Sequence, residues 1–234
     1  MLTLLMIDSV NKDRANNVFN YCLSKFKFED AKLLSPFPAQ HWYDVTIEPI
    51  NGLGAYSEFM LKNLGDYFNT SHCLVIQWDG FIVNPAAWTE EFLNYDYIGA
   101  PIPPSLVAKF PESAMYPSDY LIFNGGFSLR SKRLYDALKK IQPINCHPED
   151  QAICGYYRTE LEKLGIKFPP LRVARKFAVE YGDLIKDQFG QHGGYFDAYG
   201  NIVDRNAWGR RLDYKDWQKR GNLNALKNRT NIRV

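Results

Sequence analysis

Leu74-Val75-Ile76-Gln77-Trp78-Asp79-Gly80 is a short apolar run that stops at Gln77 and is followed by one carboxylate and a glycine. Apolar runs of this length predict a strand that is buried on both faces of a sheet. In open α/β sheets, ligands bind just beyond the carboxyl ends of such strands. Asp79 is therefore predicted to lie at a binding site, where its hard oxygen atoms suit a divalent cation that carries a phosphorylated substrate. The alternative is a polar strand end that faces water.

Strands and helices alternate on both sides of this stretch. Residues 2–7 are predicted to form the first strand, with Asp8 at its carboxyl end, and Asn11 can cap the helix that follows. Apolar residues recur every three or four positions in that helix and in two more, at about 55–68 and 149–164, the last stopped by Gly165. The alternation predicts an α/β fold, with a mostly parallel central sheet and helices on both faces.

Two further segments have a less regular pattern. Residues 86–93 are predicted to be helical. Residues 103–117 hold four prolines without a clear period, and we expect them to form a long loop over the sheet edge or the site. Loops of that length in a compact domain often carry function.

Charge divides the chain near residue 205. The 234 residues, 46% of them apolar, suffice for one well-packed domain, or for a domain with a tail. Residues 205–234 hold nine Lys or Arg against two acids, which leaves 19 of the 28 basic and 24 of the 26 acidic residues before them. We therefore predict a domain over residues 1–204 and a basic, aromatic-containing tail over residues 205–234.

The tail has two interpretations. Its aromatic residues, Trp208, Tyr214 and Trp217, could pack a solvated helix onto the domain. Its basic residues could instead contact an anionic acceptor, a donor phosphate or an anionic membrane surface. Nucleic acid is the less favoured partner.

The sequence also bears on the compartment. Residues 1–7 have no basic region of the kind that starts a signal peptide, and no apolar run approaches the ~18 residues of a membrane-spanning helix. The four cysteines lack paired C-x-x-C spacing, which favours free thiols over a zinc site. We expect a cytoplasmic protein with peripheral contact to a membrane through the tail.

The sequence lacks the motifs of several common enzyme classes. The chain has no G-x-x-x-x-G-K-[ST] loop, no G-x-G-x-x-G after the first strand, no G-x-S-x-G elbow and no H-E-x-x-H. P-loop phosphoryl transfer, Rossmann dinucleotide binding, serine hydrolysis and zincin chemistry are therefore not expected.

Three other segments are candidates for function, and each has a structural alternative. The pair Gly125 and Gly126 lets a ligand approach the backbone closely, or forms a tight turn or bulge. Glu149 and Asp150 at a helix start can supply a general base, or simply complement the helix dipole. His192, among three glycines in residues 189–194, is predicted to lie in a mobile loop that closes over the site as a metal ligand, or to be a structural or solvated histidine.

Taken together, these segments resemble the small GT-A-type glycosyltransferases, especially an uncharacterised family found in bacteria and large viruses. The resemblance covers roughly residues 1–194 and depends on the order and spacing of several modest motifs. The matching stretches are Val75-Ile76-Gln77-Trp78-Asp79-Gly80-Phe81-Ile82, Tyr95-Asp96-Tyr97-Ile98-Gly99-Ala100-Pro101, Asn124-Gly125-Gly126-Phe127-Ser128-Leu129-Arg130, Pro148-Glu149-Asp150, Phe177-Ala178-Val179-Glu180 and Phe189-Gly190-Gln191-His192-Gly193.

The resemblance implies a GT-A (Rossmann-like) fold and sugar transfer from a nucleotide-sugar donor, a UDP- or GDP-sugar, to a saccharide or glycolipid acceptor. In such enzymes a D-x-D motif binds a divalent cation, usually Mn²⁺ and otherwise Mg²⁺, that holds the donor diphosphate. This role maps to Asp79, with Gln77 standing where the first aspartate would be. A late histidine often completes the metal shell, which maps to His192.

The remaining roles implied by the resemblance concern the base and the donor. The catalytic base of many inverting members maps to Asp150 first and to Glu149 second. Gly125 and Gly126 would lie beside donor sugar and acceptor, and Asp8 would face the nucleotide base or ribose.

Two other classes remain as alternatives. A non-catalytic nucleotide-sugar or carbohydrate binding module is suggested by the neutral Gln77. A sugar nucleotidyltransferase would carry a glycine-rich loop with Arg and Lys after the first strand, and residues 8–14 lack those glycines.

Overall fold

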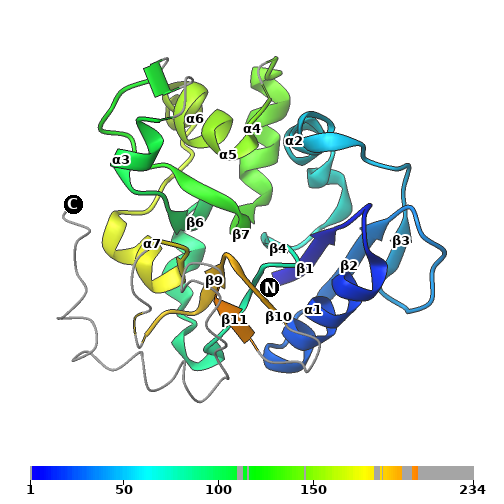
Figure 1. Cartoon of the computed structure of the whole chain (residues 1–234). Helices are drawn as coiled ribbons and strands as arrows, with labels where there is room; N and C mark the ends of the chain where they lie inside the picture. Colours follow the sequence, from blue (N-terminus) through cyan, green and yellow to red (C-terminus); the bar gives the residue numbers. More distant parts are fainter. Residues whose placement is uncertain are drawn as a thin grey trace.

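A computed structural model describes residues 2–109, 113, 114, 116–144, 146–181, 185, 187–196 and 202–204, the last two strands by their backbone alone. A six-stranded sheet with the order β3-β2-β1-β4-β7-β6 forms its centre (Figure 1). The strands are β1 (Leu2–Ile7), β2 (Asp30–Ser35), β3 (Asp44–Thr46), β4 (His72–Ile76), β6 (Tyr97–Pro101) and β7 (Phe123–Ser131). The predicted tail and its boundary at residue 205 lie outside the described residues.

The direction of the strands confirms the predicted fold class, with one correction. β1 pairs in parallel with β2 and β4, and β2 pairs in parallel with β3. β7 is antiparallel to both of its neighbours, β4 and β6, so the sheet is mixed rather than wholly parallel. The parallel strands bring their carboxyl ends, including Asp8 and Gln77, to one edge of the sheet.

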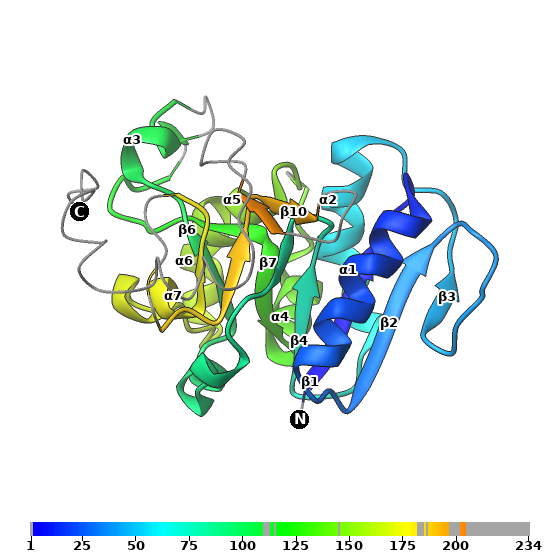
Figure 2. The ribbon, with the colours of Figure 1, turned by 60° about the horizontal axis from the view of Figure 1, so that its bottom comes forward.

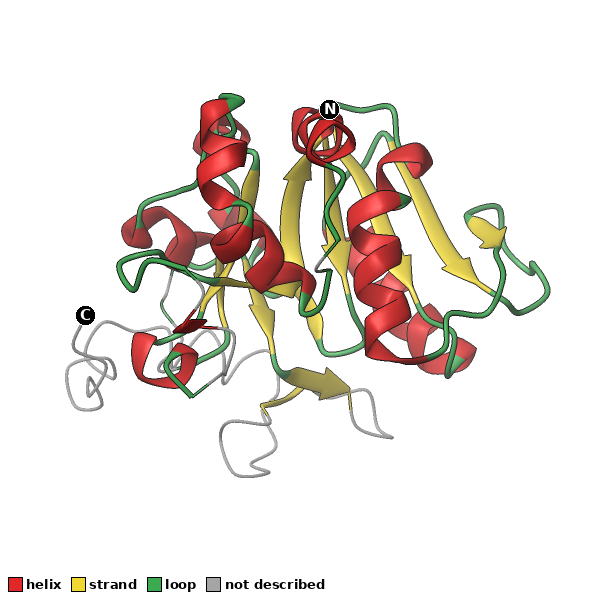
Figure 3. Ribbon diagram, turned by 90° about the horizontal axis from the view of Figure 1, so that it is seen from above, coloured by secondary structure: helices red, strands yellow, loops and turns green. Residues whose placement is uncertain are grey.

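Helices cover both faces of the sheet. α1 (Lys12–Lys25) packs on one face, whereas α2 (Gly52–Lys62) and α4 (Lys132–Ile141) pack on the other (Figures 1 and 2). The connection from β6 to β7 holds a short helix, α3 (Pro104–Val107), so the predicted long loop is partly helical. α7 (Leu171–Phe177) lies against β6, and Figure 3 shows the strands side by side with the helices around them.

The polar signals at helix ends act as expected. Asn11 Oδ1 accepts a hydrogen bond from Arg14 N at the start of α1, and Ser131 Oγ accepts one from Leu134 N at the start of α4. Each side chain satisfies a backbone donor that the first helical turn leaves free. Gly165, with φ of +81°, follows α6 (Arg158–Lys163) as predicted, because glycine adopts this left-handed conformation without strain.

Three predicted helices are interrupted. The helix expected over 149–164 is α5 (Glu149–Gln151), a π-helical turn η5 (Ala152–Tyr156) and then α6. Residues 86–93 form two 3₁₀ turns, η2 (Pro85–Ala87) and η3 (Glu90–Asn94), rather than one helix. Asn84 and Thr89 each accept a bond from a backbone N–H two residues ahead, which starts a new turn at each place. A third 3₁₀ turn, η1 (Leu64–Tyr67), ends the helix expected over 55–68.

A second, three-stranded sheet corrects the prediction of a mobile loop around His192. It has the order β5 (Gly80–Ile82), β9 (Gly190–His192) and β8 (Ala178–Val179). Gly80 pairs with His192 in the antiparallel β5–β9 ladder. A hairpin of β10 (Gly194–Phe196) and β11 (Ile202–Asp204) follows. His192 is therefore held by a ladder of backbone hydrogen bonds, which the glycine-rich sequence alone does not signal.

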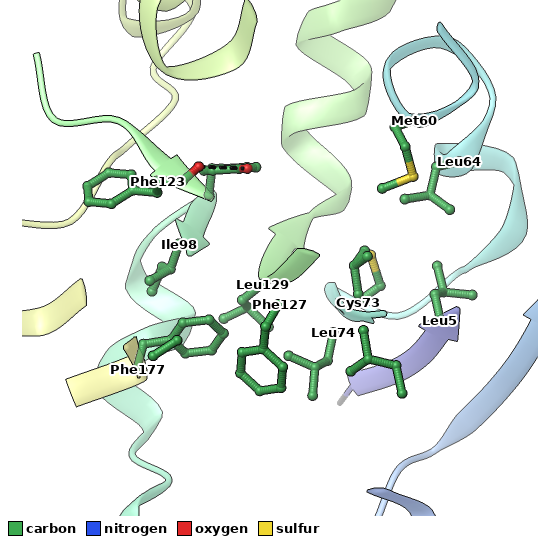
Figure 4. Close-up of a cluster of buried hydrophobic side chains, with 14 of the residues drawn as sticks. Leu5, Met60, Leu64, Cys73, Leu74, Ile98, Phe123, Phe127, Leu129 and Phe177 are labelled. Atoms are coloured by element: carbon green, nitrogen blue, oxygen red, sulfur yellow. Dashed lines mark hydrogen bonds between the residues drawn. The ribbon is translucent and has the colours of Figure 1, made fainter. Parts of the chain in front are cut away.

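The core fills both sides of the central sheet. Alternate residues of one strand point to opposite faces, so Cys73 lies on the side of Met60 of α2 and Leu64 of η1, while Leu74 lies near Phe127 (Figure 4). On the second side, the rings of Phe127, Phe177 and Phe189 are mutually packed, with centroids 5.3–6.0 Å apart. None of the helices in the described part of the chain is long and apolar enough to cross a membrane.

Candidate active site

The Gln77–Gly80 segment is a tight turn between β4 and β5. The N–H of Gly80 donates to the carbonyl of Gln77 at 3.0 Å, which closes the turn just beyond the carboxyl end of β4. A Cβ on Gly80 would lie 2.6 Å from the carbonyl oxygen of Gly126, so the turn sits directly on β7. Asp79, for which the sequence predicted a place at a binding site, is buried in this turn.

His192 lies between two carboxylates. Its Nε2 is 3.4 Å from Oδ1 of Asp79, and its Nδ1 is 3.3 Å from Oε1 of Glu180. Burial of the ring favours the neutral form, but the two carboxylates outweigh it and raise the pKa of His192 to about 9. Asp79 and Glu180 therefore stabilise a positive charge between them, here that of the protonated His192 ring.

The side-chain amide of Gln77 completes the same cluster. Its Nε2 donates to the hydroxyl of Tyr56 at 2.8 Å, and its Oε1 is 3.4 Å from Nε2 of His192. Asp79 Oδ1 and Gln77 Oε1 thus both lie 3.4 Å from His192 Nε2. We call these three groups the cation cluster.

The glycine pair joins the cation cluster to the acid pair. A Cβ on Gly126 would lie 2.2 Å from His192 Nε2 and 2.5 Å from Gln77 Oε1. A Cβ on Gly125 would lie 2.1 Å from Oε1 of Glu149. Side chains essentially never approach so closely, so only glycine fits at either position. On β7, Gly126 therefore lies beside the cation cluster and Gly125 lies beside Glu149 of the acid pair.

Glu149 is held by a fully buried arginine. Nη2 of Arg130 lies 2.9 Å from Oε1 of Glu149 and also donates to the carbonyl of Gly125 at 3.2 Å. The guanidinium lies over the ring of Tyr97, 5.2 Å from its centroid. A buried ion pair of this kind fixes the position of both partners, because either charge alone would be costly to bury.

Asp150 has a different environment from Glu149. It is partly exposed, and its Oδ1 accepts a hydrogen bond from the backbone N–H of Gln151 at 2.7 Å. Desolvation, and then the negative charge of Glu149, raise the pKa of Asp150 to about 7, with a further contribution from Glu180. A carboxylate with this pKa is suited to accept a proton near neutral pH.

Helix α2 contacts both the cation cluster and the segment that carries the acid pair. Tyr56 binds Gln77, as described above. The next residue, Ser57, has its Oγ 2.8 Å from Nδ1 of His147, which directly precedes Pro148 and the acid pair. Burial and the charge of Glu149 raise the pKa of Tyr56, so its hydroxyl is neutral.

Asp8 lies at the same sheet edge, but its carboxylate binds its own chain. Oδ1 accepts hydrogen bonds from the N–H groups of Val10 and Asn11, and Oδ2 is 3.5 Å from Nη2 of Arg14. The Arg14 guanidinium in turn lies over the ring of Trp78, 4.3 Å from its centroid. Arg14 and Trp78 are thus the partly exposed groups at this strand end, and the sequence analysis assigned a role to neither.

The cation cluster offers three atoms that could bind a metal ion. The described residues contain no group of three or more His, Cys, Asp or Glu side chains that could hold a metal ion. Asp79, His192 and the amide oxygen of Gln77 nevertheless offer two oxygens and one nitrogen, a donor set that suits Mn²⁺ or Mg²⁺ if ligand oxygens complete it. Glu180 lies on the other ring nitrogen of His192, where a carboxylate commonly orients a metal-binding histidine.

Comparison with known proteins places the chain in a family. A family model described as "Protein of unknown function (DUF5672)" matches residues 43–192. The chain belongs to this family. The matched range of the DUF5672 model includes the cation cluster, the glycine pair and the acid pair, and leaves out Asp8. The candidate site residues that lie close together in the structure are therefore all within the DUF5672 domain.

A search of curated proteins gives no match. Among solved structures, the chain is similar to galactosyltransferase LgtC in complex with donor and acceptor sugar analogs. The identity is 10%, the TM-score is 0.39, and the alignment covers 99% of this chain and 97% of that one. A likeness at this level does not bear on the function of the DUF5672 protein.

Three residues of the site were not assigned from the sequence. Glu180 ends one of the stretches that carry the family resemblance, and Arg130 ends another, but neither had a role. Tyr56 appeared only as a member of an apolar helical stripe. The signal that could have identified Arg130 and Glu180 is a charged residue near the end of a buried strand or directly after it.

Proposed function

We propose that this protein is a glycosyltransferase that moves a sugar from a nucleotide-sugar donor to an acceptor hydroxyl, with inversion at the anomeric carbon. One observation carries the proposal. The glycine pair of β7 lies between a cluster suited to a cation and Glu149, whose neighbour in sequence, Asp150, is a carboxylate with a pKa of about 7. Transfer from a nucleotide sugar needs both, because a diphosphate must leave while a hydroxyl loses its proton.

Asp150 is the general base in this proposal. It is partly exposed, whereas Glu149 is buried and paired with Arg130. Asp150 would take the proton of the acceptor hydroxyl as the oxygen attacks the anomeric carbon from the face opposite the diphosphate. Arg130 and Glu149 would position Asp150 by holding the start of α5 against β7.

Asp79, His192 and Gln77 would hold a divalent cation, Mn²⁺ or Mg²⁺. When bound, such a cation stabilises the negative charge that develops on the leaving diphosphate. Glu180 would keep Nδ1 of His192 protonated, so that Nε2 faces the cation. Gly125 and Gly126 would lie beside the donor sugar and the acceptor, and their missing side chains leave room for Glu149, His192 and Gln77.

The donor is proposed to be a UDP- or GDP-sugar and the acceptor a saccharide or glycolipid. Asp8 holds Arg14 beside Trp78 at the adjoining strand end, where a cation and an aromatic face suit a nucleotide. A cytoplasmic location with peripheral membrane contact through the basic tail is part of the same proposal.

Release of nucleoside diphosphate from a panel of nucleotide sugars with Mn²⁺ tests the function. We expect release with at least one donor, and a loss of at least about 100-fold in Asp150→Asn with donor binding retained, as for removal of a general base. Equal turnover by wild type and Asp150→Asn would remove Asp150 from its role.

A non-catalytic binding module is the second candidate, because Gln77 leaves the cation cluster with one carboxylate fewer than a D-x-D site. It predicts a thermal shift with nucleotide sugars but no release or transfer with any donor and acceptor.

A further inference from the structure

Tyr56 is a residue of the site to which the proposed function gives no role. It lies in α2, and its hydroxyl accepts the hydrogen bond from Nε2 of Gln77 at 2.8 Å. The amide of Gln77 is the neutral member of the cation cluster. How it is oriented therefore decides what it presents to a cation.

The Gln77 amide has two orientations that exchange Oε1 and Nε2. In one, Oε1 is 3.4 Å from Nε2 of His192, and the cluster gains an oxygen donor. In the other, an NH₂ group faces the same point and repels a cation. A carboxylate at this position would have two equivalent oxygens and would need no such control.

The hydroxyl of Tyr56 selects between these orientations if it acts as an acceptor. A tyrosine hydroxyl can also donate, so the destination of its own proton matters. The negative charges of Glu149 and Asp150 act on Tyr56 from the acid pair. They disfavour loss of the hydroxyl proton, and the neutral hydroxyl oxygen of Tyr56 accepts the hydrogen bond from Nε2 of Gln77.

We propose that Tyr56 is a positioning residue which holds the Gln77 amide with Oε1 toward Asp79 and His192, so that Gln77 supplies the third donor atom for a divalent cation. This inference rests on the cation site of the proposed function. It explains how a glutamine can act as a metal ligand where other enzymes have a pair of aspartates. It also makes the orientation of Gln77 depend on α2, the helix that carries Tyr56.

Mn²⁺ binding to the full-length protein, measured by electron paramagnetic resonance without any substrate, tests the inference. We expect Tyr56→Phe to weaken Mn²⁺ binding roughly 10-fold, as loss of an orienting partner of a metal ligand does. Tyr43→Phe is the matched control, because Tyr43 also makes one side-chain bond, to Asn20 at 2.9 Å, and directly precedes β3, which β2 and β1 separate from β4. It should bind Mn²⁺ as the wild type does.

The same measurement in a Gln77→Glu background separates positioning from a general structural effect. The two oxygens of a carboxylate are equivalent, so Tyr56→Phe should there cost less than about 2-fold in Mn²⁺ affinity. An equal loss in both backgrounds, or no loss in either, would overturn the role of Tyr56. A wild-type protein that binds no Mn²⁺ would instead contradict the cation site itself. Tyr56 is partly exposed and the phenylalanine keeps the ring, so the variant is expected to fold.

Discussion

Gly126 lies so close to His192 that a Cβ on the glycine would be 2.2 Å from Nε2 of the histidine. One residue belongs to the central sheet and the other to the small sheet of β5, β9 and β8, so this contact joins the two sheets at the candidate site. The site depends on a place where no side chain intervenes between β7 and β9.

Gly126→Ala should therefore displace His192 and Gln77. We expect Mn²⁺ binding and nucleotide-diphosphate release to fall by at least about 100-fold, since a displacement near 1 Å in a site can cost that much. Gly54→Ala is the matched control. Gly54 lies in α2 with no atom within 4 Å of its added Cβ, and alanine there should leave Mn²⁺ binding unchanged and stabilise the helix by up to about 1 kcal/mol. Wild-type Mn²⁺ affinity in Gly126→Ala would contradict the geometry of the site.

The pH dependence of turnover should follow Asp150. The base must be deprotonated, and its pKa is about 7, so kcat/KM should rise tenfold per pH unit below pH 7 and level off above it. Measurement of initial rates from pH 5 to 9 checks this. Arg130→Lys, which keeps the positive charge but loses the planar contacts with Glu149 and Gly125, should shift the midpoint upward. A midpoint below pH 5 in the wild type would exclude Asp150 as the titrating base.

Asp150 should also reduce stability above neutral pH. Its pKa in the folded protein is raised from 3.8 to about 7, so folding favours the protonated form. The stabilising contribution is complete below pH 4 and is lost as the pH rises to 7. Asp150→Asn should thus be more stable than wild type at pH 8, by roughly 1 to 3 kcal/mol after allowance for partial exposure, and no more stable at pH 3.5. Urea titrations at both pH values measure this difference, and a constant difference would contradict the shift.

Arg130→Met should be one of the most destabilising single changes in the domain. It leaves Glu149 buried without its partner, which costs about 3–5 kcal/mol. The double variant Arg130→Met/Glu149→Gln should lose less than the sum of the two single variants, because the remaining uncompensated charge is gone. Thermal unfolding of the four proteins tests the coupling. Additive losses would show that the 2.9 Å ion pair contributes little.

The sequence predicted those parts of the fold that depend on local physical chemistry. The apolar runs of β1 and β4, the caps at Asn11 and Ser131 and the stop at Gly165 all follow from the preferences of single residues and their near neighbours. Asp79, Gly126 and His192 were also predicted as site residues, and the structure places them together.

Other features depend on pairing between distant segments and could not be predicted in this way. Gly190–His192 looks like a flexible loop in the sequence, and only its pairing with β5 and β8 makes it a strand. The antiparallel course of β7 becomes evident only from its pairing with β4 and β6. The partners of Arg130 and Gln77, namely Glu149 and Tyr56, lie on other elements, and no local pattern links them.

The most direct test of the central claim is the product of transfer. The full-length protein would be incubated with the donor that shows nucleotide-diphosphate release, Mn²⁺ and a saccharide or glycolipid acceptor, and the new linkage examined by proton NMR. We predict a glycoside whose anomeric configuration is opposite to that of the donor, formed by wild type and not by Asp150→Asn. A product that retains the donor configuration, or equal transfer by Asp150→Asn, would contradict the account.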